Sequence, residues 1–437
     1  MFSHSQAHLT TNMTVIETEM LLNRDFAQTR GLPVTGEYTV SPHHSGVFPV
    51  HQQLYDAWKK VWKVRVTSTE EYPNLRPAHL RRGFIYKDIM VLPRQTCGLY
   101  THTILLERYP GGREKLEGSI FGGDLFYAFI FNQVNVFMTH QSNYANDRLA
   151  LYTFESAVKF VQCWTNLQLL TLPPLQLAKR YFLTYTEEKE PIWRNPCDDR
   201  RHYNIWWAGK SCFRWPQFLI IGPQKTGSTA LYSFLTMHPS VVASRPSATT
   251  FEEVQFFSGG QHYLRGIDWY MDFFQLPNDT HLVLPTESPA IAAAAVAAAT
   301  NNSITGHQKF MQRVPPEAKE GPPYFFEKSS TYFDGEMVPM RAHALLPHAK
   351  LIVILLSPLK RAYSWYQHMR AHNHTAALNF TFYEVVSLDV QHRGNLGEKT
   401  LKRLRDLRSR CLGPGAYAVH LERWLAYYPP QQVMHRG

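Results

Sequence analysis

The most informative segment of the chain is the octapeptide Gly222-Pro223-Gln224-Lys225-Thr226-Gly227-Ser228-Thr229. It follows an apolar run at 218–221, which predicts a short buried strand, and precedes residues 230–235, whose pattern predicts a helix. A strand, a loop with spaced glycines and a helix are typical of phosphate binding, because backbone N–H groups can approach the anion closely. The segment therefore predicts a site for a phosphorylated ligand; the alternative is a structural turn with a surface lysine.

The position of the lysine distinguishes two classes of phosphate-binding loop. In a P-loop NTPase the lysine directly follows the second glycine. Here Ser228 holds that position, and Lys225 lies two residues before Gly227. This spacing argues against an ATPase and matches the loop of sulfotransferases that use 3′-phosphoadenylyl sulfate (PAPS) as sulfate donor.

A second strand–loop–helix unit follows in the same half of the chain. Residues 350–356 form a continuous apolar run, which is typical of a central parallel strand, and residues 361–372 are expected to be the next helix. The repeated unit predicts an α/β fold in which a sulfotransferase-like domain has a central parallel sheet. We expect this domain to span 217–437, with a low-complexity Ala- and Pro-rich insertion at 282–322; the alternative is an ordinary long loop with one helix.

The first part of the chain has a different pattern. Residues 1–190 are expected to form a mixed α/β region, followed by a Pro- and Trp-rich linker at 191–216. Within that region, residues 89–92 and 134–138 are expected to be strands, and residues 151–170 a helix.

Transfer of a sulfuryl group requires a cation near the oxygen that develops negative charge and a base that removes a proton from the acceptor. Lys225 can provide the cation. Glu252 and Glu253 lie among apolar residues and are candidate bases. The pattern is equally compatible with two glutamates on a surface helix.

Composition limits the possible partners without choosing one. The 437 residues carry a formal charge of +10, which suggests an anionic partner such as a nucleotide, a nucleic acid or an acidic polysaccharide. Residues 393–410 hold seven Lys/Arg and two acidic residues, so a nucleic-acid-binding helix is a rival interpretation. Neither a leader nor an apolar span is visible. Of the five cysteines, Cys197 and Cys212 are the closest pair for a bridge.

Long stretches of the chain resemble the bifunctional heparan sulfate N-deacetylase/N-sulfotransferases. The resemblance extends over nearly the whole chain outside the insertion, and its most specific segments are residues 68–73, 91–98, 139–144, 220–227 and 361–368. It implies N-sulfation of heparan sulfate glucosamine with PAPS as donor, a polysaccharide partner and no nucleic acid, and a Golgi location. In the intact family a membrane anchor precedes the part matched here.

For the sulfotransferase half, the resemblance implies specific residue roles. Lys225 corresponds to the catalytic lysine, and Glu253 to the proposed base. Ser364 corresponds to the serine that holds the 3′-phosphate of PAPS, and His368 lies one helical turn further on, near the acceptor. An arginine that many sulfotransferases carry is replaced by Leu356, so Arg361 is expected to substitute for it.

For the first part, the resemblance implies the C-terminal portion of the deacetylase region. There a metal-bound water, with zinc as the expected metal, attacks an N-acetyl group. His4 and His8 have the spacing of metal ligands on a helix, although the chain's 21 histidines make such pairs common by chance. His140 resembles the general acid. His43 and His44 lie near that cleft or in an ordinary loop.

The chain departs from the intact family in ways that bear on activity. The upstream aspartates are absent, and residues 432–437 lie where a further strand is expected to begin, before a second basic loop of the family. We therefore expect an inactive deacetylase half and a sulfotransferase half that binds the donor without efficient turnover. An inactive heparan-binding or scaffold fragment is the alternative.

Overall fold

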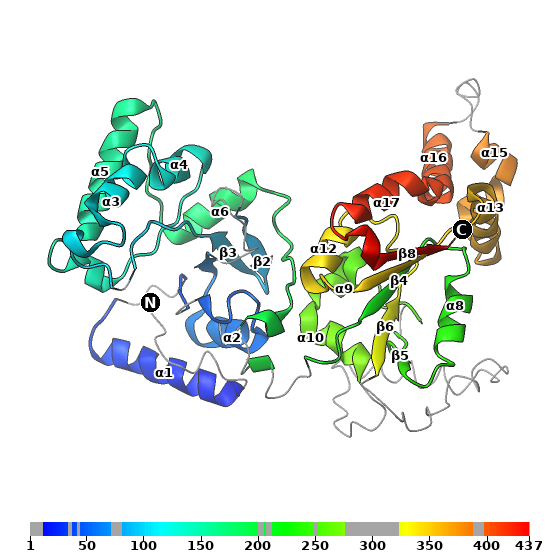
Figure 1. Cartoon of the computed structure of the whole chain (residues 1–437), viewed down its shortest axis with the longest axis horizontal. Helices are drawn as coiled ribbons and strands as arrows, with labels where there is room; N and C mark the ends of the chain where they lie inside the picture. The colour runs from blue at the N-terminus through cyan, green and yellow to red at the C-terminus, as the bar shows by residue number, and fades with distance from the viewer. Residues whose placement is uncertain are drawn as a thin grey trace. The chain divides into compact units, whose positions relative to one another are not determined.

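A computed structural model describes residues 12–33, 37–41, 44–70, 81–100, 102–199, 205–206, 212–247, 252–275, 323–387 and 397–436. The chain divides into two compact units, Met1–Lys210 and Ser211–Gly437 (Figure 1). Both His4 and His8 lie outside the described residues, as does the whole of the expected insertion at 282–322.

The first unit contains a small mixed sheet. Its strands are β1 (Val66–Thr69), β3 (Ile89–Pro93) and β2 (Phe84–Tyr86), in the order β1-β3-β2, with β1 parallel and β2 antiparallel to β3. The sheet is covered by α6 (Pro174–Thr184), whose Ala178, Tyr181 and Phe182 are buried against Val66 and Leu92. The predicted strand at 89–92 is thereby confirmed as β3.

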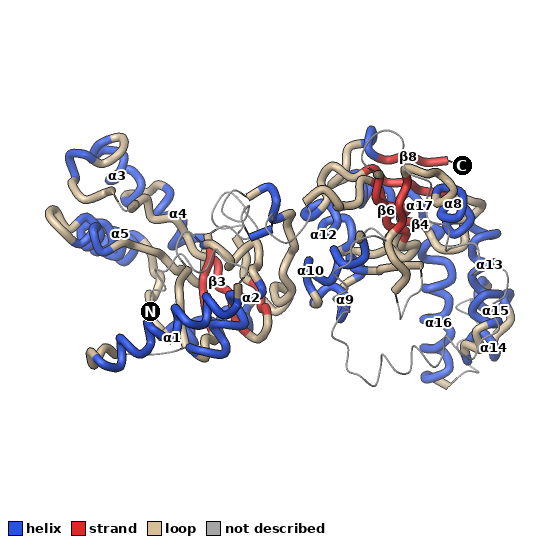
Figure 2. The backbone as a smooth tube through the Cα atoms, turned by 90° about the horizontal axis from the view of Figure 1, so that it is seen from below, coloured by secondary structure: helices blue, strands red, loops and turns tan. Residues whose placement is uncertain are grey.

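Helices make up most of the rest of the first unit. α1 (Met13–Thr29), α2 (Gln52–Ala57) and the π-helical turn η3 (Trp58–Trp62) pack together. A separate layer contains α3 (Gly112–Ile120), α4 (Asp124–Phe131) and α5 (Leu149–Trp164), which lie side by side in Figures 1 and 2. Short 3-10 turns complete the unit: η5 (Leu106–Arg108), η6 (Gln141–Tyr144) and η7 (Pro196–Asp198).

Two sequence predictions in this unit need correction. Residues 134–138 do not form a strand: Phe137 makes only an isolated bridge to Gln95. Their apolar side chains instead fill two cores, Val134 beneath α6 and Phe137 against the α3–α5 layer, which explains the strand-like composition. The helix expected at 151–170 ends at Trp164, where Thr165 adopts an extended conformation and its hydroxyl donates to Val161 O.

A five-stranded sheet forms the centre of the second unit. Its order is β5-β6-β4-β7-β8, and every neighbouring pair is parallel. The strands are β4 (Phe218–Gly222), β5 (Val241–Ala243), β6 (Tyr324–Lys328), β7 (Lys350–Ile354) and β8 (Val433–Arg436). The predicted strands at 218–221 and 350–356 are confirmed as β4 and β7, and β8 forms where a further strand is expected.

Helices surround this sheet. α8 (Ser228–Leu235) follows β4 and places Tyr232 against Ile220 and Phe326. Three more helices lie to the left of the sheet in Figure 1, whereas α8 lies to its right. They are α9 (Gly260–Leu264), α10 (Gly266–Met271) and α12 (Val338–Leu345), and the turns η8 (Phe256–Ser258) and η9 (Asp272–Phe274) belong to the same part of the chain. α17 (Tyr417–Leu425) packs on the unit through the buried Trp424, whose indole N–H donates to Phe333 O at 3.1 Å. Turns η12 (Gly413–Gly415) and η13 (Pro430–Gln432) flank it.

A helical cluster follows β7. It consists of α13 (Pro358–Ala371), α14 (Thr375–Asn379), α15 (Phe382–Val386) and α16 (Glu398–Leu412), which run close together in Figure 2. Pro358 begins α13, where its missing N–H removes no helical hydrogen bond. α16 buries Leu404, Leu407 and Cys411, and five of its basic residues are exposed: Lys399, Lys402, Arg403, Arg405 and Arg410.

Cys197 and Cys212, the closest pair for a bridge along the sequence, are both disulfide-bonded, whereas Cys97, Cys163 and Cys411 are free. Across the described residues, no helix combines the length and the apolar character that a membrane crossing needs.

Candidate active site at the carboxyl ends of the sheet

The candidate site lies where β4, β6 and β7 end. In a parallel sheet the loops that follow the carboxyl ends of neighbouring strands meet at one edge, and ligands bind there. β4 leads into the loop 223–227, β6 ends at Lys328, and β7 leads into α13. Three segments that are distant in sequence therefore share one edge.

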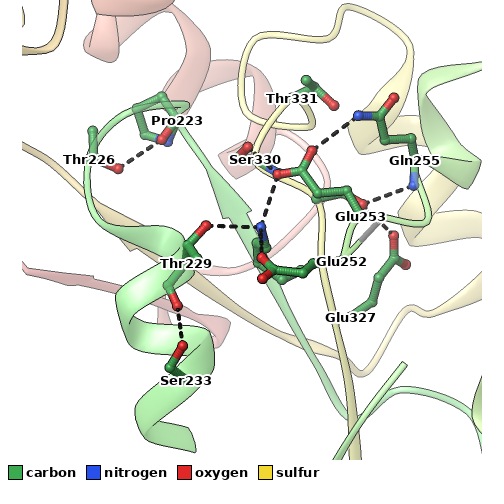
Figure 3. Close-up of polar contacts among 12 residues, drawn as sticks. Pro223, Thr226, Thr229, Ser233, Glu252, Glu253, Gln255, Glu327, Ser330 and Thr331 are labelled. Carbon is green, nitrogen blue, oxygen red and sulfur yellow. Dashed lines mark hydrogen bonds and ion pairs between the residues drawn. The ribbon is translucent and has the colours of Figure 1, made fainter. Parts of the chain in front are cut away.

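The first of these segments is the loop between β4 and α8. Lys225 has φ of +68° and Gly227 has φ of +103°, so the chain reverses sharply before the first turn of α8. Thr226 is buried, and its hydroxyl donates to Pro223 O at 2.8 Å, which braces the loop (Figure 3). The first N–H groups of α8 have no acceptor within the helix, so they are available to an anion.

Side-chain exposure within the octapeptide fits that role. Gln224 and Lys225 are half-buried, Ser228 is buried, and Gly227 and Thr229 are exposed. Lys225 has a lowered pKa, because burial disfavours its charge and Lys328 repels it, while Glu253 acts in the opposite direction. The predicted catalytic lysine is therefore held in a partly desolvated position within the electrostatic reach of the predicted base.

The end of β4 lies very close to the segment that follows β6. A Cβ atom on Gly222 would lie 2.2 Å from the carbonyl oxygen of Ser330, and Gly222 has φ of +102°. Only glycine combines that conformation with that contact. The glycine thus fixes the distance between the octapeptide and the segment that follows β6.

Lys328 connects these segments. It is 3% exposed, and its ammonium group lies 3.0 Å from Glu252 Oε2 and 3.2 Å from Glu253 Oε1. It also donates to Thr229 Oγ1 at 3.2 Å. Its three partners, Thr229, Glu252 and Glu253, are labelled in Figure 3. The two glutamates do not lie on a helix, so the alternative of a surface-helix pair is wrong. They face a buried cation instead.

Glu253 is strongly bonded as a carboxylate. Ser330 donates to Oε1 through its hydroxyl at 2.5 Å and its N–H at 3.3 Å, and the Gln255 amide donates to Oε2 at 3.1 Å. Burial raises the pKa of Glu253, but the charge of Lys328 and these hydrogen bonds outweigh it and lower the pKa overall. The group is therefore ionised at neutral pH and can accept a proton.

The α13 residues have different environments. Ser364 is exposed on the helix, and His368 is half-buried one turn later. The pKa of His368 is lowered by burial first, and then by the charges of Lys225 and His372. Its imidazole ring lies 4.0 Å from that of His372, centroid to centroid. His368 is therefore close enough to Lys225 to sense its charge, which brings α13 to the same edge.

Arg361 is placed differently from the sequence expectation. It is fully buried, and its Nη2 donates to the carbonyl of Cys411 on α16. Its Nε and Nη1 have no hydrogen-bond partner among the residues that the structure describes. Burial lowers its pKa, opposed by Cys411, Tyr417 and Asp334. A phosphate contact by Arg361 would thus require a change in its side-chain conformation.

The first unit holds two further groups of polar residues. His140 lies directly before η6 and is half-buried, and its backbone N–H donates to Asn143 Oδ1 at 2.8 Å. His44 contacts Arg94 Nη2 at 2.7 Å through Nδ1, and Arg94 Nε lies 3.3 Å from Glu70 Oε1. Among the described residues, no group of three or more His, Cys, Asp or Glu could hold a metal ion.

Two family models match the chain. The sulfotransferase domain model covers residues 215–435, and the deacetylase domain model of heparan sulfate N-deacetylase covers residues 1–126. The chain belongs to the sulfotransferase family. Its α/β fold with a parallel sheet is the fold of that family, as the sequence predicts.

Curated relatives narrow the assignment within that family. A bifunctional heparan sulfate N-deacetylase/N-sulfotransferase of Drosophila melanogaster is 55% identical over 99% of this chain and 38% of the relative. The human enzymes of that name numbered 2 and 1 are 52% and 50% identical, each over 99% of this chain and 44% of the relative. The resemblance to the bifunctional family is confirmed; the chain spans less than half the length of these relatives.

One solved structure, a sulfotransferase from Alicyclobacillus acidocaldarius, matches with 20% identity and a TM-score of 0.30 over 51% of this chain and 72% of that chain. At this score the likeness supports no conclusion.

Sequence reasoning missed two residues of this candidate site. Lys328 and Ser330 both contact Glu253, yet neither was a candidate. A usable signal existed: Glu327 and Lys328 are two charged residues at the end of an apolar strand, next to Ser329 and Ser330. Charged residues at the carboxyl end of a parallel strand are candidates for function.

Proposed function

We propose that the second unit binds PAPS and transfers its sulfuryl group to the free amine of glucosamine in heparan sulfate. Bound PAPS would supply the sulfuryl group. The observation that carries this proposal is the meeting of Lys225, Lys328 and Glu253 at one edge of the sheet, two cations beside an ionised base. The names of the curated relatives supply the substrate class.

The donor would be held by the octapeptide and by α13. Backbone N–H groups at the start of α8 and the side chains of Gln224, Ser228 and Thr229 would contact a phosphate, with Gly227 allowing a close approach. Thr226 would contribute its backbone N–H, because its hydroxyl donates to Pro223 O. The exposed Ser364 is the proposed contact of the 3′-phosphate. Arg361 remains a proposed second contact, on condition that it rotates out of its buried position.

The chemistry assigned to this chain's residues is proton removal and charge neutralisation. As the acceptor nitrogen bonds to sulfur, it must lose one proton, and Glu253 is the proposed acceptor of that proton. The bond between sulfur and the bridging oxygen breaks, and that oxygen gains negative charge. Lys225 is proposed to neutralise it, with Lys328 as a second cation. His368 is proposed to contact the polysaccharide acceptor.

For the rest of the chain we propose a portion of an N-deacetylase region at 1–190 and a linker at 191–216, before the transferase domain at 217–437. His140 would be the acid of that region, and His4 with His8 would contribute to a site for zinc. We also propose a Golgi location, because the relatives are by name N-deacetylases and N-sulfotransferases of heparan sulfate. The partner would be the polysaccharide and not nucleic acid.

The proposal is tested by incubating the purified chain with labelled PAPS and N-deacetylated heparosan. Label transfer that is lost in Lys225→Ala and Glu253→Gln, but kept in Lys350→Ala at the opposite end of β7, is the expected result. No transfer by a folded chain that still binds heparin would favour the second candidate, a heparan-binding protein without turnover. The exposed basic side chains of α16 support that candidate.

A further inference from the structure

A second carboxylate, Glu327, lies directly behind the proposed base. It is fully buried on β6, one residue before Lys328. Three hydroxyl groups donate to it: Tyr332 to Oε1 at 2.5 Å, Ser329 to Oε1 at 2.8 Å, and Tyr270 to Oε2 at 2.5 Å. Burying a carboxylate costs free energy unless hydrogen bonds replace the lost water. The three donors meet that requirement and hold the Glu327 carboxylate in one orientation.

Two of these hydroxyls also accept hydrogen bonds from the backbone of the segment 252–257. Ser329 Oγ accepts the N–H of Gln255 at 3.0 Å, and the Tyr332 hydroxyl accepts the N–H of Phe257 at 3.1 Å. Because each hydroxyl donates its single proton to Glu327, its lone pairs are turned towards these N–H groups. Glu327 thus sets the direction of both relays.

The segment held in this way carries Glu253. Gln255 has φ of +54°, a conformation that non-glycine residues rarely adopt without outside support. Its side-chain amide donates to Glu253 Oε2 at 3.1 Å. Gln255 therefore links the two carboxylates: its backbone N–H donates to Ser329, which donates to Glu327, and its side-chain amide donates to the proposed base.

We propose that Glu327 is a positioning residue, which fixes the backbone of Gln255 and Phe257 through Ser329 and Tyr332 and so holds the Glu253 carboxylate at the reacting edge. The part of this inference that concerns catalysis rests on the proposed function. The part that concerns the segment 252–257 does not, because it can be measured without turnover.

The first measurement is amide hydrogen exchange of the full chain, followed on peptides that cover residues 252–257. Ser329→Ala removes one relay, Tyr332→Phe removes the other, and Glu327→Gln removes the charge that directs both. We expect exchange of this segment to become about tenfold faster in each variant, the size expected for loss of a hydrogen bond supported by a charged group. Peptides from α13 should keep their protection.

Two controls match these substitutions. Ser258→Ala removes an exposed hydroxyl that lies 3.5 Å from Thr331 Oγ1, and Tyr428→Phe removes a buried hydroxyl that donates to Leu346 O at 3.0 Å. In the described part of the chain, neither hydroxyl is hydrogen-bonded to Glu327, Ser329 or Tyr332, so neither variant should accelerate exchange at Gln255. If Glu327→Gln does not fold, Ser329→Ala, a much smaller change, decides the question.

The second measurement is steady-state N-sulfation together with PAP affinity (PAP is the desulfated donor). A positioning role predicts a kcat about tenfold lower in Ser329→Ala and Tyr332→Phe, with PAP affinity within about twofold of the wild type. Unchanged exchange of 252–257 in all three variants overturns the inference, whatever the activity. A wild type that binds no PAP contradicts the proposed function, and the exchange data then still decide whether Glu327 holds the segment.

Discussion

The ammonium group of Lys328 lies 3.2 Å from Oε1 of Glu253, although the two residues are 75 positions apart in the chain. The pair forms because β6 ends at Lys328, beside the loop that begins α8. A buried cation in this position both lowers the pKa of the base and adds positive charge at the edge where a sulfate donor would bind. Three predictions concern this edge directly.

Replacing Lys328 with Met should impair the reaction more than donor binding. The cation would be lost from the site, so kcat should fall about 100-fold or more, as for removal of one preorganised charge-stabilising group. The pKa of Glu253 should rise, because the charge that lowers it is gone, and the acidic limb of the pH–rate profile should move to higher pH. Lys350→Met, at the opposite end of β7, is the control. An acidic limb that stays in place contradicts the assignment of Glu253.

Replacing Gly222 with Ala should destabilise the protein strongly. The new Cβ would lie 2.2 Å from Ser330 O, and φ of +102° is unfavourable for alanine, so the free energy of unfolding should fall by on the order of 3 kcal/mol. Urea unfolding measures this. Gly413→Ala, a position with open space around it, should be nearly neutral. Equal effects at both glycines would mean that the close approach to Ser330 is not a constraint.

The buried carboxyl of Glu327 should leave a signature in the pH dependence of stability. Burial raises its pKa from 4.5 to about 6, partly offset by its three hydroxyl donors. A raised pKa contributes stability that is complete below the unfolded value and is lost as pH rises through about 6. Compared with Glu327→Gln, the wild type should lose up to about 2 kcal/mol between pH 4.5 and pH 7. Glu336→Gln, which removes an exposed carboxylate, is the control. A wild-type-to-Gln difference that is constant over this range refutes the prediction.

The exposed basic face of α16 should bind an acidic polysaccharide. Heparin affinity should fall with rising salt, because neutralised sulfates release counterions, and DNA of equal charge should bind more weakly. Charge reversal at Lys402 and Arg405 should reduce heparin affinity about tenfold or more, whereas the same change at Lys179 in the first unit should have little effect. Preferential binding to DNA would support the nucleic-acid interpretation.

Local patterns predicted the second unit well, because its decisive signals are short-range. The strand at 218–222, the glycine spacing and the helix at 228–235 are adjacent in sequence, and so are β7 and α13. The error at 134–138 has the opposite origin. There an apolar run serves two different cores and not a sheet, which depends on contacts that no local pattern contains.

The same distinction applies to the site. The loop spacing predicts Lys225, and the resemblance to the bifunctional family predicts Ser364 and His368, whereas Lys328 contacts glutamates about 75 residues away in the chain. The resemblance also predicts Arg361 as a phosphate contact, yet this side chain is buried and donates to Cys411 O on α16, which no local pattern contains. For the first unit, His4 and His8 lie outside the described residues, so their metal role remains a prediction.

The most direct test of the central claim is calorimetric titration of PAP into the wild-type chain and into the variants Lys225→Ala and Ser364→Ala, with Lys350→Ala as control. The account predicts that the wild type and the control bind, and that affinity falls about tenfold or more in both site variants, because each removes a proposed contact with a phosphate group. A folded wild type that binds no PAP, or two site variants that bind as well as the wild type, would contradict it.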